Sequence, residues 1–232
     1  AVADRLSAYV AGVYDTGHDA RALPATLATF FFAFQIYCDF SGYSDIAIGS
    51  AQLFGVRLMT NFRRPYFARS VAEFWTRWHI SLSTWFRDYV YIPLGGNRVH
   101  AGRWVRNLLL TFLLSGLWHG ANWTYVVWGL LNGVYVALSV TTIEFRRRIA
   151  TAIGLARVPR VHRALQVAAT FTLISLTWVF FRADSATTAV RMLGNMIGSW
   201  HWVDVGVVGG GDVPLSLALI GIVIGAEACM GD

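Results

Sequence analysis

The sequence predicts an all-α protein that crosses a membrane several times. Three observations support this prediction: the composition, the apolar windows and the placement of the arginines. Hydrophobic residues make up 56% of the 232 residues and charged residues only 14%, and the mean hydropathy is +0.49. Average soluble domains carry about 25% charged residues, so this chain lacks the charge that a water-exposed surface requires. The composition therefore predicts that a lipid bilayer surrounds much of the chain and is one of its partners.

Four apolar windows are the candidate membrane helices. Residues 123–143 carry no charge and meet the length of about 20 residues that a spanning helix needs. Residues 22–40 contain one charge, at Asp39. The windows 165–181 and 213–230 are shorter. The polar residues 1–21 are interpreted as the end of a loop.

The first window is expected to break at a segment that contains Asp39, Gly42 and Asp45. A helix over residues 23–40 and a second one over residues 46–56 are predicted on either side of it. Carboxylates that face lipid are costly, so Asp39 and Asp45 are predicted to line a polar cavity. An interfacial position, or capping of the broken helix, would also account for them.

Residues 70–90 predict an amphipathic helix that lies in the membrane interface or dips inward, packed by protein. Ser70 and Glu73 have the spacing of a capping box. Large apolar side chains recur at intervals of three and four residues, at positions 74, 75, 78, 82, 85, 86 and 89. His79 falls on this aromatic face, and the segment carries too much charge to cross a bilayer freely.

The segment after the turn at residues 93–97 predicts a hairpin of two helices. A helix over residues 104–118 would be about 22 Å long, which is shorter than a hydrocarbon core of about 30 Å. The chain would then reach a bend with His119 and Asn122 at membrane depth, before the span 123–143.

The arginines gather in two stretches, within residues 57–106 and 146–163. Both are expected on the cytoplasmic side by the positive-inside bias. They flank segments of lipid length, so no nucleic-acid partner is expected.

Two of the six histidines, His79 and His119, lie among tryptophans, and a single histidine in such surroundings is more often structural than catalytic. The pair nevertheless suggests chemistry, because a neutral imidazole has the basicity to take a proton from a hydroxyl near pH 7. Nearby arginines are able to hold the phosphates of an acyl carrier. Neither Cys38 nor Cys229 has a partner at ligand spacing, so no metal site is expected. The remaining histidines are interpreted as structural; they are His18, His100, His162 and His201.

Four ordered motifs carry a resemblance to a known family. They are FQIYCDFSGYSD at 34–45, FWTRWHISLSTWFRDY at 74–89, YIPLGGN at 91–97 and GLWHGANW at 116–123. With these motifs the chain resembles the membrane-bound O-acyltransferase family, and within it the branch of bacterial alginate O-acetyltransferase subunits. The resemblance implies a funnel-shaped bundle with short interfacial or re-entrant helices. It also implies that His119 matches the catalytic histidine of the family and His79 its second motif histidine.

The resemblance also implies the reaction and its setting. An acetyl group would pass from a cytoplasmic thioester donor, with acetyl-CoA as the expected donor and no bound cofactor, to a hydroxyl of an exported polysaccharide or to an extracytoplasmic acetyltransferase. The expected location is the bacterial inner membrane, crossed in several passes. The chain does not start with Met, so we expect residues 1–232 to be the C-terminal portion of one membrane-embedded domain whose N-terminal spans are missing.

The substrate is expected to meet residues around the two histidines. Asn122 is predicted to hydrogen-bond near the reacting centre, and Arg77 and Arg87 to meet the donor, although interfacial anchoring also explains both arginines. Trp78 and Trp118 complete the predicted substrate-binding set, together with Asp39 and Asp45. Two other functions stay open at this point: a transporter or channel subunit that uses Asp39, Asp45 and His119, and a non-catalytic scaffold of a polysaccharide export complex.

Overall fold

The computed structural model describes residues 2–15, 21–198 and 212–229, and within these ranges every regular element is a helix. The prediction of an all-α protein is therefore confirmed. The chain divides into two compact units, one formed by residues 1–56 and 178–232 and the other by residues 57–177. Each unit is described by itself below. The prediction of one domain over residues 1–232 stays a prediction.

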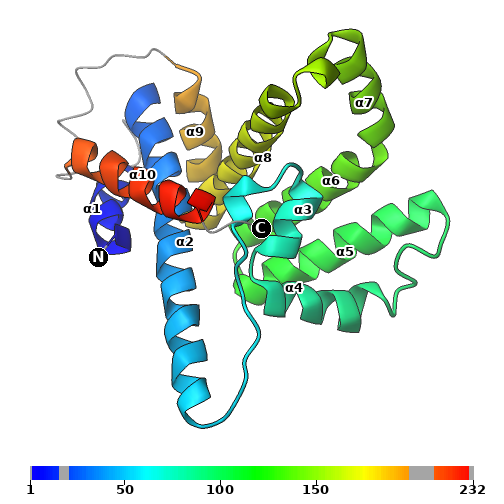
Figure 1. Cartoon of the computed structure of the whole chain (residues 1–232), viewed down its shortest axis with the longest axis horizontal. Coiled ribbons are helices and arrows are strands. Elements are labelled where there is room, and N and C mark those ends of the chain that lie inside the picture. Colours follow the sequence, from blue (N-terminus) through cyan, green and yellow to red (C-terminus); the bar gives the residue numbers. More distant parts are fainter. Residues whose placement is uncertain (1, 16–20, 199–211, 230–232) are drawn as a thin grey trace. The chain divides into compact units, whose positions relative to one another are not determined.

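The first unit is built on helices α1 (Val2–Tyr14) and α2 (Ala22–Leu53), which pack side by side (Figure 1). The interpretation of residues 1–21 as a loop was wrong for the α1 portion. Leu6, Val10 and Val13 recur at intervals of four and three residues, and all three are buried. This spacing places them on one helical face, and the burial of that face against α2 stabilises a helix that its polar residues had obscured.

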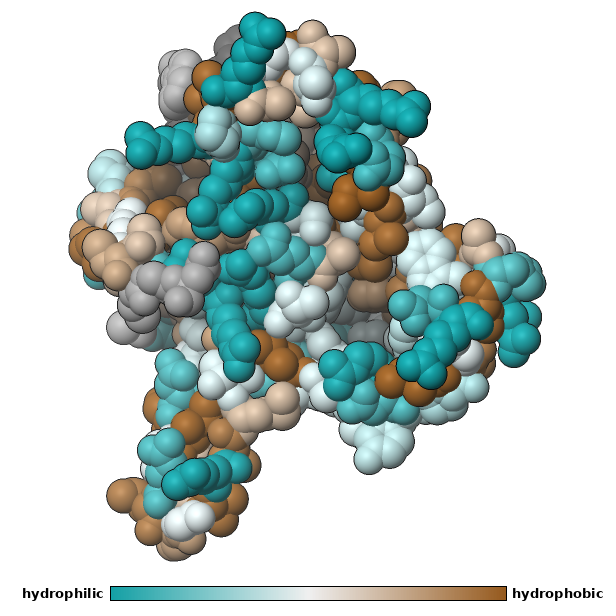
Figure 2. Space-filling view, turned by 45° about the vertical axis from the view of Figure 1, so that its right-hand side comes forward, coloured by the Kyte–Doolittle hydropathy of each residue, from teal (hydrophilic) through white to brown (hydrophobic). Residues whose placement is uncertain are grey.

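Helix α2 continues through Asp39, Gly42 and Asp45, so the predicted break was wrong. No residue of that segment lacks a backbone N–H group, and one glycine inside a helix costs only about 1 kcal/mol. At about 1.5 Å per residue the 32 residues of α2 reach farther than a hydrocarbon core of about 30 Å. Both aspartates are exposed on its surface. The C-terminal end of α2 also exposes apolar side chains (Figure 2), including Leu53, which is 86% exposed.

The other elements of the first unit are α9 (Ala186–Met196), α10 (Val213–Cys229) and the last residues of α8 (Pro159–Arg182). α9 packs against α2, and α10 against α1. The Tyr37 hydroxyl of α2 donates to a carboxylate oxygen of Glu227, which is buried in α10. This contact gives the one carboxylate of the apolar window 213–230 a polar partner, as a buried acid requires. His18 and His201 lie outside the described residues.

The second unit is dominated by the helical hairpin of α5 (Ala101–His119) and α6 (Trp123–Thr141), which lie side by side (Figure 1). The predicted hairpin is therefore confirmed. α7 (Ile143–Ala152), the short turn η3 (Leu155–Arg157) and most of α8 follow it. Three helices of the described residues, α2, α6 and α8, are long and apolar enough to cross a membrane.

The segment before the hairpin is broken where one helix was predicted. It consists of the turn η1 (Pro65–Phe67), α3 (Val71–Arg77), α4 (Ile80–Phe86) and the π-helical turn η2 (Arg87–Tyr91). The single amphipathic helix over residues 70–90 was wrong, because Trp78 is extended and His79 adopts a left-handed conformation between α3 and α4. Periodicity reports which residues share a helical face, and it does not detect a turn of two residues between two short helices.

Candidate functional site

His119 is the last residue of α5, and the glycines of the hairpin set its position. A Cβ atom on Gly116 would lie 2.3 Å from the Tyr125 backbone oxygen, and one on Gly129 would lie 2.3 Å from the Phe112 backbone oxygen. Real Cβ atoms do not approach this closely, so glycine at both positions lets the two backbones touch. The hairpin therefore fixes the position of His119 beside the first turns of α6.

The imidazole of His119 is surrounded by aromatic rings. The ring centroids of Trp118 and Trp128 lie 5.0 Å and 5.1 Å away, both edge-on, and that of Tyr125 lies 6.2 Å away. Burial among these rings lowers the pKa of His119 to about 4, because a desolvated imidazole disfavours its charged form. At neutral pH His119 is therefore an uncharged base.

His79 comes to the same place from the junction of α3 and α4. Its φ angle is +42°, a left-handed conformation in which histidine is more frequent than most residues. Its ring lies 6.4 Å from the Trp118 ring, centroid to centroid. Burial lowers the pKa of His79, and the charge of protonated His119 lowers it further. The structure thus brings the two predicted histidines together around Trp118.

The buried amide of Asn132 holds Trp75 and Trp128, two of the aromatic residues near His119. The Trp75 ring of α3 packs edge-on against Trp128 of α6, with centroids 5.7 Å apart. The indole N–H of Trp75 donates to Oδ1 of Asn132 at 3.3 Å, and the Asn132 amide donates to the Trp128 carbonyl at 2.9 Å. Sequence reasoning missed Asn132. Its signal was an amide inside the otherwise apolar window 123–143, where a polar side chain needs a partner.

Another buried amide fixes the turn that leads into α5. Asn107 is fully buried, and its amide nitrogen donates to the Leu94 carbonyl at 3.0 Å and to the Gly96 carbonyl at 3.4 Å. Residues 91–97 were singled out as a motif, whereas Asn107 was not. The turn therefore depends on a side chain that its own sequence does not contain.

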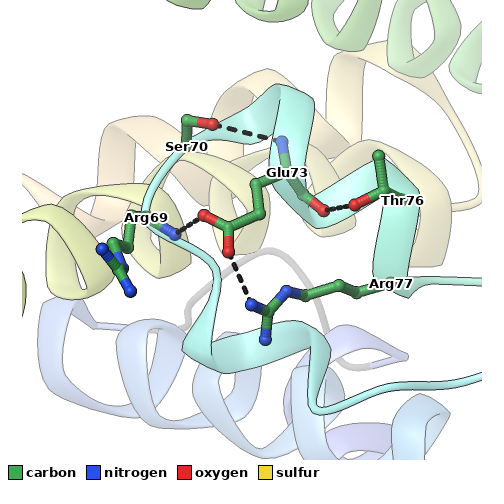
Figure 3. Close-up of polar contacts among 5 residues, drawn as sticks. All are labelled: Arg69, Ser70, Glu73, Thr76 and Arg77. Atoms are coloured by element: carbon green, nitrogen blue, oxygen red, sulfur yellow. Dashed lines mark hydrogen bonds and ion pairs between the residues drawn. The ribbon is translucent and has the colours of Figure 1, made fainter. Parts of the chain in front are cut away.

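The start of α3 is fixed by a polar network around Glu73 (Figure 3). Ser70 Oγ accepts the Glu73 backbone N–H at 3.1 Å, which confirms the Ser70 cap. The Glu73 carboxylate accepts the backbone N–H of Arg69 at 2.8 Å, one residue earlier than in a capping box, and pairs with the Arg77 guanidinium at 2.6 Å. These contacts anchor α3 and with it Trp75.

The remaining predicted site residues differ in their hydrogen-bond partners and in their exposure. Arg77 is paired with Glu73, and Arg87 pairs with its neighbour Asp88 at 2.7 Å on the surface. Trp78 is only 4% exposed, which leaves little of its ring for a substrate, whereas Trp118 is 59% exposed. Asn122 Oδ1 accepts the Thr124 backbone N–H at 3.0 Å and so caps α6. Asp39 and Asp45 belong to the first unit and the histidines to the second.

A separate cavity of about 450 Å³ lies in the second unit, between α3, α6, α7 and α8. Aliphatic residues make up half of its lining, and Arg69, Arg146 and His162 are among its polar residues. Neither His79 nor His119 lines it. The histidine pair is therefore a separate feature, formed by the hairpin bend and the α3–α4 junction.

The helices long enough to span a membrane and the two desolvated histidines define a membrane protein that holds a pair of uncharged imidazoles among aromatic rings. The chain belongs to the membrane-bound O-acyltransferase family, whose sequence profile matches residues 21–183. This stretch includes both histidines and most of the described helices. Family membership favours acyl transfer over the transporter and scaffold alternatives.

The curated relatives include proteins named as an alginate O-acetylase, a peptidoglycan O-acetyltransferase and a teichoic acid D-alanyltransferase. The chain is 49% identical over 178 residues to a probable alginate O-acetylase of Pseudomonas fluorescens, which covers 77% of the chain and 34% of the relative. It is 39% identical over 197 residues to a peptidoglycan O-acetyltransferase of Helicobacter pylori, covering 85% and 36%. A teichoic acid D-alanyltransferase of Streptococcus thermophilus is 30% identical over 171 residues, covering 68% and 41%. The chain thus spans about a third of the length of the first two relatives.

Proposed function

We propose that this chain carries the histidine centre of a membrane O-acetyltransferase in the bacterial inner membrane, crossed in several passes. The observation that carries the proposal is the meeting of His79 and His119 around Trp118, from two segments 40 residues apart, in surroundings that keep both imidazoles uncharged. The acyl donor is a cytoplasmic thioester, with acetyl-CoA as the first choice. The acceptor is a hydroxyl of an exported polysaccharide or of a partner acetyltransferase.

His119 acts as the general base in this proposal. Its ring nitrogen takes the proton of the acceptor hydroxyl while the oxygen attacks the thioester carbonyl. A C–O bond forms, the C–S bond breaks, and the departing sulfur takes the proton from the imidazolium. The donor leaves as a free thiol, so His119 ends the cycle uncharged. Burial lowers the pKa of His119, so its ring is unprotonated and able to accept a proton at neutral pH.

His79 orients the acyl group or the acceptor beside His119. The exposed ring of Trp118 lies beside both imidazoles and offers an apolar surface for the acetyl group. Arg77 and Arg87 remain candidates for the phosphates of the donor, and each would have to exchange its present carboxylate partner for them. Asn122 lies at the bend, where its side-chain oxygen accepts the Thr124 backbone N–H.

Transfer of labelled acetyl groups from acetyl-CoA tests the proposal in membranes that contain the full-length protein. His119→Ala is expected to lower the rate by several orders of magnitude. His162→Ala, which removes a histidine outside the pair, serves as the matched control and should keep the wild-type rate. Equal transfer by the His119→Ala variant and the wild type, at equal amounts of inserted protein, would make His119 structural. Absence of transfer in the wild type would overturn the proposed function, since acetyl-CoA is its named donor.

A further inference from the structure

Asn61 lies in the segment without helix that precedes η1, and it is bound to the junction between α3 and α4. Its backbone carbonyl accepts the Ile80 N–H at 3.0 Å. Its side-chain Oδ1 accepts the Ser81 backbone N–H at 3.1 Å and the Ser81 hydroxyl at 2.7 Å. All three donors thus belong to the two residues that directly follow His79.

These contacts replace a cap that α4 does not have locally. The first N–H groups of a helix have no partner within it, and a side chain at the N-cap position normally accepts one of them. His79 occupies that position in α4, and its side chain makes no capping bond. Asn61 supplies the acceptor instead, from 20 residues away in the sequence.

The same segment also holds the chain on the other side of His79. The Arg63 N–H donates to the Arg77 carbonyl at 2.9 Å. His79 is therefore clamped on both sides in a left-handed conformation that residues with a side chain rarely adopt. Without the clamp, the helical periodicity of residues 70–90 favours one continuous helix. Such a helix would change the direction in which the imidazole leaves the backbone, and with it the contact with Trp118.

We propose that Asn61 is a positioning residue for the reaction, because it holds the turn that places the His79 imidazole against Trp118 and His119. This inference rests on the proposed acetyl transfer, for which it names the residue that sets the place of His79. Asn61 does not act on the substrate itself. Its effect passes through the backbone of residues 79–81.

The test compares Asn61→Ala with Asn61→Asp in the full-length protein, using the acetyl-transfer assay normalised to inserted, monodisperse protein. Asn61→Ala removes the acceptor of both Ser81 donors and is expected to lower kcat on the order of 10- to 100-fold, because small misplacements of reacting groups have effects of this size. KM for the donor should change little. Asn61→Asp keeps an oxygen acceptor, and its charge suits a helix N-terminus, so it should recover most of the wild-type kcat.

Asn195→Ala is the matched control, because it truncates an asparagine of α9 that lies outside the second unit. Its kcat should equal that of the wild type. Unchanged kcat in Asn61→Ala would overturn the positioning role. Equal losses in the Ala and Asp variants would overturn it as well, because they would show that the acceptor oxygen is not what matters.

Two further variants decide the question if Asn61→Ala fails to insert. Ser81→Ala removes one of the donors to the same oxygen, and it should lower kcat by less than Asn61→Ala; a wild-type kcat there would contradict the proposal. In a His79→Ala background, Ser81→Ala should make no difference to the residual rate, because residues that act as one unit are not additive. An independent effect would mean that the Asn61–Ser81 contact acts elsewhere than through His79. A wild-type protein without any transfer would overturn the proposed function, and this inference with it.

Discussion

The two histidines reach the same place by opposite structural means. His119 ends a regular helix, and its position follows from glycines that bring α5 and α6 into backbone contact. His79 stands at a break between two helices of seven residues each, in a left-handed conformation held by hydrogen bonds from a distant segment. One histidine is therefore placed by close packing and the other by polar contacts that oppose the local helical tendency.

This difference predicts how each position responds to change. Close packing between backbones has no room to adjust, so a single added methyl group has a large effect. A turn held by several hydrogen bonds loses them one at a time, and its sensitivity is spread over several residues. The hairpin is therefore expected to fail abruptly and the junction gradually.

Among the changes that leave both histidines in place, the largest effect is expected from Gly129→Ala in the hairpin. The added Cβ would lie 2.3 Å from the Phe112 backbone oxygen, so α5 and α6 must separate and His119 must move away from Trp128. Acetyl transfer should fall on the order of 100-fold, with a lower thermal midpoint in detergent. Gly221→Ala in α10 is the matched control, because a Cβ there meets nothing within 4 Å. Wild-type activity in Gly129→Ala would mean that the hairpin does not set the position of His119.

The pH dependence of the rate tests the surroundings that both histidines share. The pKa of His119 is lowered to about 4, from an ordinary value of about 6.5. The neutral base thus persists as the pH falls, and transfer should stay constant from about pH 8 to about pH 5.5 and decline below that. A rate that is already halved at pH 6.5 would show that the His119 ring is accessible to water.

The same shift has a consequence for stability. Between about pH 6.5 and pH 4 the unfolded chain binds protons that the folded protein does not, so the buried histidines lower the free energy of unfolding as the pH falls through this window. Above about pH 6.5 both states carry neutral imidazoles, and this contribution disappears. The thermal midpoint of the wild type, compared with that of His119→Gln, measures the part that belongs to His119.

The smallest effect is expected in the difference in thermal stability between two variants of residue 79. His79→Ala and His79→Gly both remove the imidazole and should lose activity together. Glycine adopts the φ of +42° without the steric cost that a Cβ brings, which is about 1 kcal/mol. The glycine variant should therefore unfold at a higher temperature than the alanine variant. Equal midpoints would indicate that the turn relaxes once the ring is gone, and that the imidazole itself helps to hold it.

Sequence reasoning succeeded where one local signal decided the outcome. The hairpin of α5 and α6, the Ser70 cap and the membrane helices α6 and α8 follow from apolar length and from capping chemistry. It failed at α2, because glycine and aspartate weaken a helix without breaking it. It also failed at α1, because a helix with a narrow apolar face resembles a polar loop until its partner is known.

What the sequence by itself determined is the membrane character of the chain, its all-α class, the hairpin of α5 and α6, and the two histidines for which chemistry is proposed. The tertiary structure alone decided that the helix predicted over residues 70–90 breaks at His79, and that Asn61, Asn107 and Asn132 support the site. The physical reason is the range of the interactions. Hydrophobic periodicity is read within a few turns of one helix, whereas each of these amides binds donors or acceptors from a different segment, and only the folded chain shows which segments meet.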